Sequence, residues 1–202
     1  MGKEHFDAIA EDWDSDAEKV SRARVVAGAV AAAVPLGLRT RVLEYGAGTG
    51  LVSQALARRV GPLTLADSSA GMRAVMERKV AAGALPGARV WDLDLERQEP
   101  PAERFDVVVA SLVLHHVHEL DRVLSGFAAL LAPGGRLCVA DLDREDGTFH
   151  DFDGHEGFDR AELAERLTAA GFADVAVEDC TELTKDGVTY SVFLAVSSRP
   201  GA

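Results

Sequence analysis

The sequence predicts an α/β protein, a three-layer α-β-α sandwich around a seven-stranded, mostly parallel sheet whose last strand is antiparallel. Two observations lead to this prediction. Short apolar runs typical of strands alternate with segments whose apolar residues recur at helical spacing, which favours parallel strands with helices on both faces. The C-terminal part breaks this alternation, because two strand-like runs are joined through Lys185-Asp186-Gly187. Such a join is typical of a hairpin, so the last strand is expected to lie antiparallel at the edge of the sheet.

Apolar periodicity predicts each element in turn. The N-terminal region, residues 1–38, is expected to be a helical cap whose main helix covers 20–34 and stops before Pro35. Strands are expected at 42–45, 63–66, 88–93, 105–110, 137–140, 175–177 and 190–196, and helices at 51–56, 72–80, 120–131 and 159–170. Pro133-Gly134-Gly135 is expected to end the third of these helices and Gly171 the last, because glycine commonly follows a helix. Residues 1–202 are expected to form one domain.

Composition limits the partners and the location. The net charge of −12 argues against nucleic acid and against an anionic membrane surface, since both need clustered Lys and Arg. Cys138 and Cys180 are expected to be reduced, buried thiols. The first residues lack the apolar segment of a signal peptide, and the longest apolar run, 25–34, is too short to span a bilayer. A cytoplasmic location is therefore expected.

The most informative stretch is Val42–Gly50, V-L-E-Y-G-A-G-T-G, where a strand carries Glu44 and three alternating glycines follow. Glycine lets the backbone turn sharply and lets a ligand approach it closely. Asp67 comes at the end of the next strand, where a carboxylate can accept hydrogen bonds from both ribose hydroxyls. A dinucleotide fingerprint would need a glycine where Leu51 stands. The pattern predicts a nucleoside site that differs from a NAD site.

From about Phe6 to its end, the chain resembles the class I S-adenosylmethionine-dependent methyltransferases, small-molecule enzymes of the ubiquinone-biosynthesis-like type. The resemblance rests on the glycine motif, on 65–68 with Met72 a helical turn later, on 91–95, and on 105–116, which ends in Leu-His-His. It implies S-adenosyl-L-methionine as the cofactor. The cofactor-binding residues that it implies are Trp13, Glu44, Gly46, Ala47, Gly48, Gly50, Asp67, Ser68, Met72, Asp94, Leu95 and Ser111.

The resemblance also implies a role for several of these residues. The backbone of the glycine motif would pass under the methionine part of the cofactor, and Glu44 would orient its amino group. Asp67 would take the ribose hydroxyls, and Met72 would pack against adenine. Simpler structural roles stay open: Asp67 can cap a helix, and Met72 can be a core residue.

A carboxylate after the third strand would accept a hydrogen bond from the adenine amino group. Asp94 is favoured because it fits the family pattern, with the Leu95 N–H facing a ring nitrogen, but Asp92 stays open. Ser111 would line the cofactor near the sulfonium. Trp13, in an N-terminal pattern that resembles the family's, would close over the cofactor, or it serves only in packing.

Residues 111–114, Ser-Leu-Val-Leu, exclude several relatives. Amino-methylating DNA enzymes carry Asn or Asp followed by Pro-Pro-Tyr or Trp at this place. Metal-dependent catechol-type enzymes carry a carboxylate where Ser111 stands, so no metal is expected. No Pro-Cys pair, as used by cytosine-C5 enzymes, occurs in the chain.

A histidine is the expected base if the methyl acceptor must lose a proton, because imidazole titrates near neutrality. His115 and His116 follow the fourth strand, and His150 and His155 lie in 148–158. The irregular segment 143–157 is expected to cover the site. Each histidine can equally be a structural residue bonded to backbone or exposed on a loop.

The sequence thus predicts methyl transfer to a small-molecule acceptor, with O-, N- and C-methylation and the oligomeric state left open. One alternative is a nicotinamide-dependent oxidoreductase, which the early third glycine and the lack of a Tyr-x-x-x-Lys pair disfavour. The other is a catalytically silent S-adenosylmethionine-binding partner or sensor, which nothing in the sequence excludes.

Overall fold

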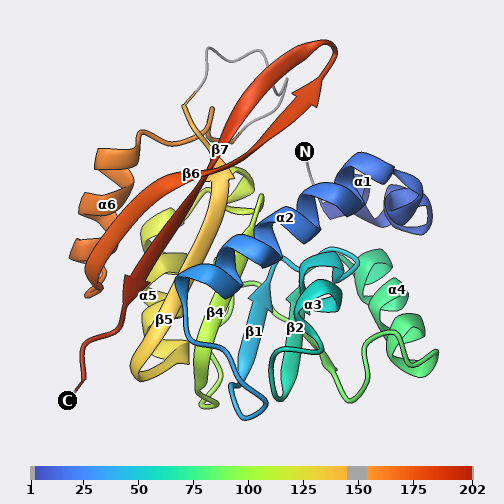
Figure 1. Ribbon diagram of the computed structural model, residues 1–202, viewed down its shortest axis with the longest axis horizontal. Coiled ribbons are helices and arrows are strands. Elements are labelled where there is room, and N and C mark those ends of the chain that lie inside the picture. The colour runs from blue at the N-terminus through green and yellow to red at the C-terminus, as the bar shows by residue number, and fades with distance from the viewer. Residues whose placement is uncertain (1–2, 145–153, 202) are drawn as a thin grey trace.

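Helices cover both faces of a seven-stranded sheet in the computed structural model of the chain, which describes residues 3–144 and 154–201 (Figure 1). The strand order is β3-β2-β1-β4-β5-β7-β6. The strands are β1 (Val42–Tyr45), β2 (Leu63–Asp67), β3 (Arg89–Asp92), β4 (Phe105–Ser111), β5 (Leu131–Leu142), β6 (Ala173–Lys185) and β7 (Val188–Ser198). The first five strands pair in parallel, and β7 runs antiparallel to both β5 and β6. The predicted α/β sandwich with one antiparallel strand is confirmed.

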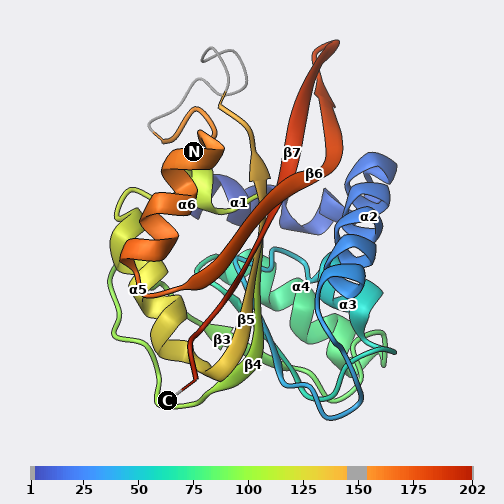
Figure 2. The ribbon, with the colours of Figure 1, turned by 60° about the vertical axis from the view of Figure 1, so that its left-hand side comes forward.

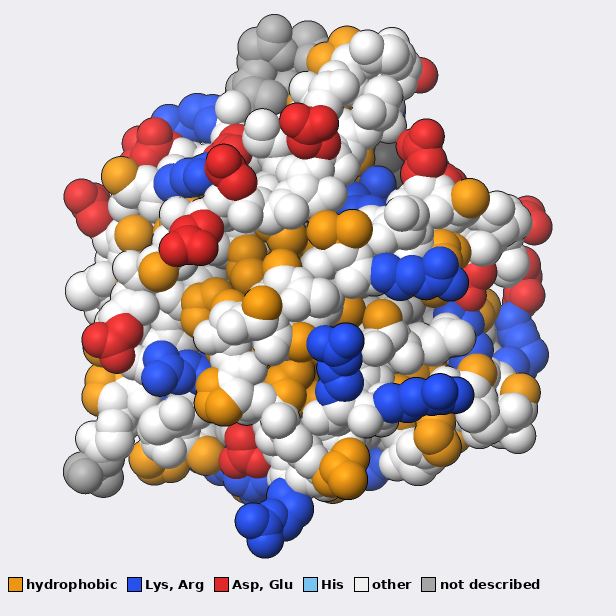
Figure 3. All heavy atoms as spheres, viewed as in Figure 1, with side chains coloured by type: hydrophobic (Ala, Val, Ile, Leu, Met, Phe, Trp, Pro, Cys, Tyr) orange, Lys and Arg blue, Asp and Glu red, His pale blue; other side chains and the backbone are white. Residues whose placement is uncertain are grey.

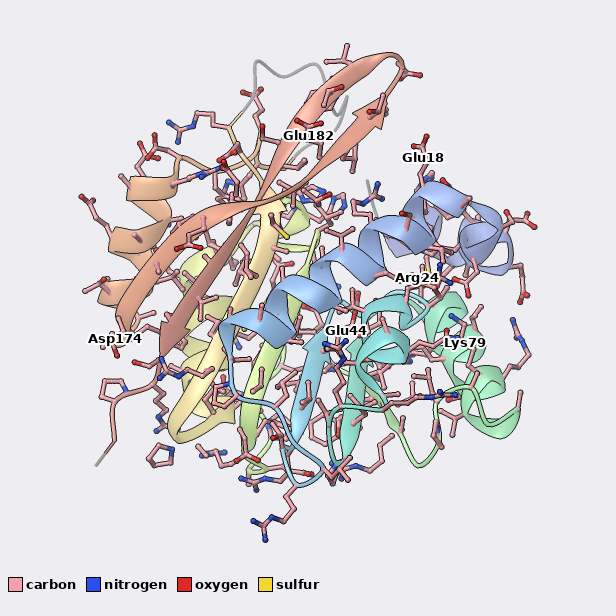
Figure 4. The ribbon with its side chains drawn as sticks, in the orientation of Figure 1. Glu18, Arg24, Glu44, Lys79, Asp174 and Glu182 are labelled. Atoms are coloured by element: carbon pink, nitrogen blue, oxygen red, sulfur yellow. The ribbon has the colours of Figure 1, made fainter. Side chains whose placement is uncertain are left out.

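The predicted place of the last strand is wrong, because β7 lies inside the sheet and β6 forms its edge. The run Val192-Phe193-Leu194-Ala195 is buried without interruption, so β7 faces apolar layers on both sides, as an interior strand does. In contrast, β6 exposes Asp174, Glu178, Asp179 and Glu182. Figure 4 shows the first and last of these acidic side chains near opposite ends of the strand. Charged side chains on an edge strand oppose pairing with another chain.

The helices are α1 (Lys3–Ile9), α2 (Ala17–Ala33), α3 (Leu51–Leu56), α4 (Ala70–Ala81), α5 (Leu120–Leu130) and α6 (Arg160–Ala169), with 3₁₀ turns η1 (Ala10–Ser15) and η2 (Leu114–His116). Figure 2 shows α5 and α6 on one face of the sheet and α2, α3 and α4 on the other. Each face has its own apolar cluster: Val30 and Met76 belong to one, and Phe127 and Leu167 to the other. None of these helices within the described ranges is long and apolar enough to cross a membrane.

The end of α5 differs from the prediction. Leu131 already has an extended backbone, with φ −81° and ψ 142°, so the helix stops at Leu130 and β5 begins at once. Pro133-Gly134-Gly135 therefore lies within β5 and does not end the helix. The buried Leu130 and Leu131 fix this boundary, because both side chains fill the core between α5 and the sheet. Gly171, with φ +92°, does follow α6 as predicted.

Charges of both signs are interspersed on the face shown in Figure 3. Lys and Arg side chains are scattered among acidic and apolar ones on this face, and acidic side chains lie over the β6–β7 hairpin. Cys138 is buried and Cys180 is partly buried, and both are free thiols. Most of the expected covering segment, 143–157, and its His150 lie outside the described residues, which resume at Gly154.

Candidate functional site

A cavity of about 650 Å³ opens at the carboxyl ends of β1, β2 and β4, where the strand order changes direction. Open α/β sheets bind their ligands at this switch point. Every cofactor-binding residue predicted from the sequence lines the cavity except Gly50 and Leu95. The members that line it are Trp13, Glu44, Gly46, Ala47, Gly48, Asp67, Ser68, Met72, Asp94 and Ser111.

Asp67 ends β2 and turns its carboxylate toward the glycine motif. One oxygen accepts from the Gly48 N–H at 2.7 Å and the other from the Ser69 N–H at 2.8 Å. The side chain that caps α4 is Ser69, which accepts from the Met72 N–H, so Asp67 is not the helix cap. Burial raises the pKa of Asp67, although both N–H groups counteract it. Each carboxylate oxygen keeps acceptor capacity for a ligand hydroxyl.

Glu44 is the second carboxylate of the cavity, and its exposed fraction is only 3%. It comes from β1 and accepts the Ser53 N–H of α3 at 2.9 Å. Burial raises its pKa to about 7, against the opposing effect of the bonds from Ser53. In Figure 4, Glu44 lies behind α2, in the interior of the molecule. A buried carboxylate of this kind gains most from a cationic ligand group.

The raised pKa of Glu44 makes the stability of the cofactor-free protein depend on pH. The ordinary value is 4.5, so between about pH 4.5 and 7 the folded protein binds more protons than the unfolded chain. The free energy of unfolding then falls as pH rises through this interval, by about 3 kcal/mol in total. We expect Glu44→Gln to abolish this decrease in the free energy of unfolding. Urea unfolding of both proteins at pH 5 and pH 8 measures the decrease. If the free energy of unfolding fell equally with pH in both proteins, the prediction would be wrong.

Gly46 and Gly50 contact the protein rather than open space. A Cβ at Gly46 would meet Val113 at 2.2 Å, and one at Gly50 would meet Leu65 at 2.5 Å. Gly50 precedes α3 with φ +80° and lies over the core, which explains why it does not line the cavity. At Gly48, in contrast, a Cβ would meet nothing within 4 Å. The open side of the motif is therefore at Gly48, next to Asp67.

Of the two carboxylates at or just after the end of β3 that the sequence left as alternatives, the structure places only one in the cavity wall. Asp94 lines the cavity, whereas Asp92 is exposed and pairs with Arg73 at 3.0 Å. Leu95 is buried, and its N–H donates to the Tyr45 hydroxyl at 3.2 Å. Because this N–H already donates to Tyr45, the hydrogen bond from Leu95 to adenine that the resemblance implies could form only if the bond to Tyr45 were broken.

Ser111 ends β4 at the floor of the cavity, and Leu112 directly follows the strand. Leu112 has φ +52°, a left-handed conformation that is rare for a branched apolar residue. Its N–H donates to the Ala140 carbonyl of β5 at 2.7 Å, which holds the turn. Strained backbone of this kind is concentrated at functional sites.

The N-terminal segment covers the cavity from above, and two carboxylates fasten it. Asp7 of α1 accepts from the Ser69 hydroxyl at 2.6 Å and from the Gly71 N–H at 2.8 Å. Asp14 of η1 pairs with Lys79 of α4 at 2.5 Å. These bonds hold the segment in which Trp13 forms part of the cavity wall.

Arg22 of α2 also lines the cavity and did not stand out in the sequence, where it is one charged residue within a helix. It is partly buried, and burial lowers its pKa against the effect of nearby Asp16 and Glu18. Within the described part of the chain it has no hydrogen bond or ion pair. The other α2 cation of the wall, Lys19, pairs with Asp16 at 3.2 Å and lies over the Trp13 ring. Arg22 therefore offers the cavity a guanidinium whose hydrogen-bond donors are not taken up by any other described residue.

Of the four candidate histidines, the three that fall within the described residues occupy different surroundings. His115 and His116 of η2 both line the cavity, with ring centroids 4.0 Å apart. The Nδ1 atom of His115 lies 2.6 Å from the Asp141 carboxylate, and the His116 ring lies edge-on to Phe6. His155 is not part of the cavity wall, and its ring lies 5.2 Å from Phe158.

Asp141 was missed in the sequence, although it directly follows the predicted strand 137–140, as Asp67 follows 63–66. Its exposed fraction is 0%. Among the described residues, no group of three or more His, Cys, Asp or Glu side chains could hold a metal ion.

The sheet order defines a Rossmann-like fold, and its cavity lies at the switch point where such sheets bind their ligands. Residues 18–177 match the sequence profile of a family described as a methyltransferase domain. The chain therefore belongs to this methyltransferase family, with the class I fold of the S-adenosylmethionine-dependent enzymes.

Two relatives of similar sequence agree with this family. The chain is 36% identical over 116 residues to an uncharacterised methyltransferase of Schizosaccharomyces pombe, covering 54% of this chain and 41% of the relative. It is 28% identical over 142 residues to the ubiquinone biosynthesis O-methyltransferase of Coxiella burnetii, covering 69% and 60%. The matched region thus spans less than two thirds of either relative.

Solved structures share the fold. A SAM-dependent methyltransferase from Aquifex aeolicus has a TM-score of 0.72 at 16% identity, covering 98% of this chain and 99% of that one. The 1,6-didemethyltoxoflavin-N1-methyltransferase of Burkholderia thailandensis, solved with S-adenosylhomocysteine, has a TM-score of 0.75 at 20% identity, covering 98% and 87%. Identities this low show the fold alone.

Proposed function

We propose that the protein transfers a methyl group from S-adenosyl-L-methionine to a small-molecule acceptor. The observation that carries the proposal is the pair of carboxylates, Asp67 and Glu44, which face one cavity on either side of an open glycine turn. Family membership supports methyl transfer over the nicotinamide alternative. Two structures of the same fold, both methyltransferases named for small acceptors, were solved with S-adenosylhomocysteine, which supports the cofactor and the acceptor class.

The residues present suit this cofactor. Asp67 would take the ribose hydroxyls, and Glu44 would pair with the ammonium of the methionine part, whose positive charge offsets the burial of the carboxylate. Arg22 would bind the methionine carboxylate, since it lines the cavity and makes no hydrogen bond or ion pair among the described residues. Asp94 would accept the adenine amino group, and Met72 and Trp13 would pack against the cofactor. The cofactor supplies an activated methyl group, so the protein chiefly has to orient the acceptor.

Replacing Arg22 tests its part in this arrangement. We expect Arg22→Met to weaken binding of S-adenosylhomocysteine roughly tenfold, about 1.4 kcal/mol, because one charge-assisted bond to the carboxylate is lost. Arg24→Met is the matched control, since Arg24 lies on the same helix and is exposed (Figure 4). Isothermal titration measures both affinities. Comparable losses in the two variants would show that Arg22 makes no specific contact.

Titration with the cofactor and with NADH tests the function itself. Saturable binding of S-adenosylmethionine, with release of S-adenosylhomocysteine when small-molecule libraries are added, supports methyl transfer. Binding of NADH with no response to S-adenosylmethionine would favour the oxidoreductase. Binding without turnover across broad libraries would favour the silent partner or sensor; a [4+2]-cyclase with a TM-score of 0.75 shows that this fold also serves other reactions. A cytoplasmic location belongs to the same proposal.

A further inference from the structure

His115 and Asp141 form a buried pair in the wall of the cavity. The Nδ1 atom of His115 is 2.6 Å from one carboxylate oxygen of Asp141, and the exposed fractions are 3% and 0%. Asp141 ends a stretch of β5 whose Ala140 pairs with Ser111 of β4, so the carboxylate comes from the strand next to the cavity floor. The pair is thus built from two adjacent strand ends, while the ring of His115 lines the cavity.

The backbone holds the carboxylate in one orientation. The Leu142 N–H donates to the oxygen that faces His115, and the Leu114 N–H donates to the other oxygen, both at 2.9 Å. These bonds favour an ionised carboxylate that accepts from His115, so the neutral ring carries its proton on Nδ1 and its basic lone pair on Nε2. Burying a carboxylate costs free energy even where hydrogen bonds compensate it, so the pair is more readily explained by chemistry than by stability.

We propose that His115 is the catalytic base of the methyl transfer, that Asp141 is its positioning residue, and that the acceptor is a hydroxyl compound. This inference rests on the proposed function. A hydroxyl oxygen is a weak nucleophile until its proton is removed, whereas a neutral amine attacks without such help. A base that is oriented by a buried carboxylate therefore suits an O–H acceptor.

The proposed step is a direct transfer of the methyl group. The acceptor oxygen forms a bond to the methyl carbon of the methylsulfonium donor, and the carbon–sulfur bond breaks with its electron pair left on sulfur. The hydroxyl proton passes to Nε2 of His115, and Asp141 stabilises the imidazolium that results. That proton then leaves to solvent, which restores the neutral ring.

The variant Asp141→Asn tests the proposal. Its control is Asp179→Asn, whose carboxylate is 93% exposed on β6. Histidine-ring ¹⁵N NMR of the S-adenosylhomocysteine complex is expected to show the Nδ1–H form of His115, and Asp141→Asn is expected to lose it. With small hydroxyl compounds, each paired with its amine counterpart, turnover is expected for hydroxyl members. Asp141→Asn is expected to lower kcat on the order of 10²–10⁴-fold, with KM and cofactor affinity within about threefold.

The pH profile separates catalysis from a structural role. Among the described residues, the His115 ring contacts the titratable side chains of Asp141 of β5 and His116 of η2, and the His155 backbone N–H donates to the His115 carbonyl. The wild-type rate is expected to level off once imidazole is neutral, and the Asp141→Asn rate to keep rising with pH. An Nε2–H ring, turnover of amines alone, or no hydroxyl turnover by a protein that binds cofactor would overturn the inference. Failure to bind any cofactor would instead overturn the proposed function.

Discussion

Asp67→Ala is expected to weaken S-adenosylhomocysteine binding on the order of 10²–10³-fold, about 3–4 kcal/mol. Two charge-assisted hydrogen bonds to ribose would be lost, each worth about 1.5–3 kcal/mol. The Gly48 N–H would also lose its partner at 2.7 Å, which would loosen the glycine turn. Isothermal titration with S-adenosylhomocysteine measures the change without any knowledge of the acceptor.

Asp92→Asn is the matched control for this variant. Asp92 is the register partner of Asp67 on the neighbouring strand β3, but it pairs with Arg73 and lies outside the cavity. We expect its replacement to change cofactor affinity less than threefold. If both variants bound equally well, or if Asp67→Ala kept wild-type affinity, the ribose would be held elsewhere and the proposed cofactor arrangement would be wrong.

The sequence predicted the central sheet well because local rules decide it. The runs 42–45 and 63–66 are apolar and end at glycine or carboxylate residues, and the structure has strands there with nearly the same bounds. The place of β7 could not be read in this way. Two antiparallel strands joined by a short turn can add to a sheet with either strand inside, and only the apolar character of both faces of β7 distinguishes the two orders.

In the candidate site, too, local sequence predicts some residues, whereas others can be recognised only in the folded structure. Glu44, Gly48 and Asp67 lie at or just after the ends of two strands in a recognisable spacing, so they could be placed together in advance. Arg22 and Asp141 could not, because their importance depends on the folded structure: Arg22 lines the cavity, and Asp141 contacts His115, 26 residues earlier. A helical arginine or an acid after a strand is too common for its sequence position to indicate a site.

Gly46→Ala is expected to lower the free energy of unfolding by about 3 kcal/mol or more. The new Cβ would lie 2.2 Å from a Val113 methyl group and 2.7 Å from the Val113 Cβ, so no rotamer of Val113 relieves the clash and backbone must move. The left-handed φ of +64° adds roughly 1–2 kcal/mol for a residue with a side chain. Urea unfolding of the cofactor-free protein measures the loss.

Gly48→Ala separates packing from ligand binding two residues further along the same turn. Its φ of +56° brings a similar backbone strain, but its Cβ would meet no atom within 4 Å. We therefore expect a loss of only about 1–2 kcal/mol in stability together with a marked loss of cofactor affinity, because the methyl group enters the open side of the cavity. A Gly46→Ala/Val113→Gly double variant should regain part of the stability that Gly46→Ala loses. Equal destabilisation at both glycines would contradict the close approach of Val113 as the cause.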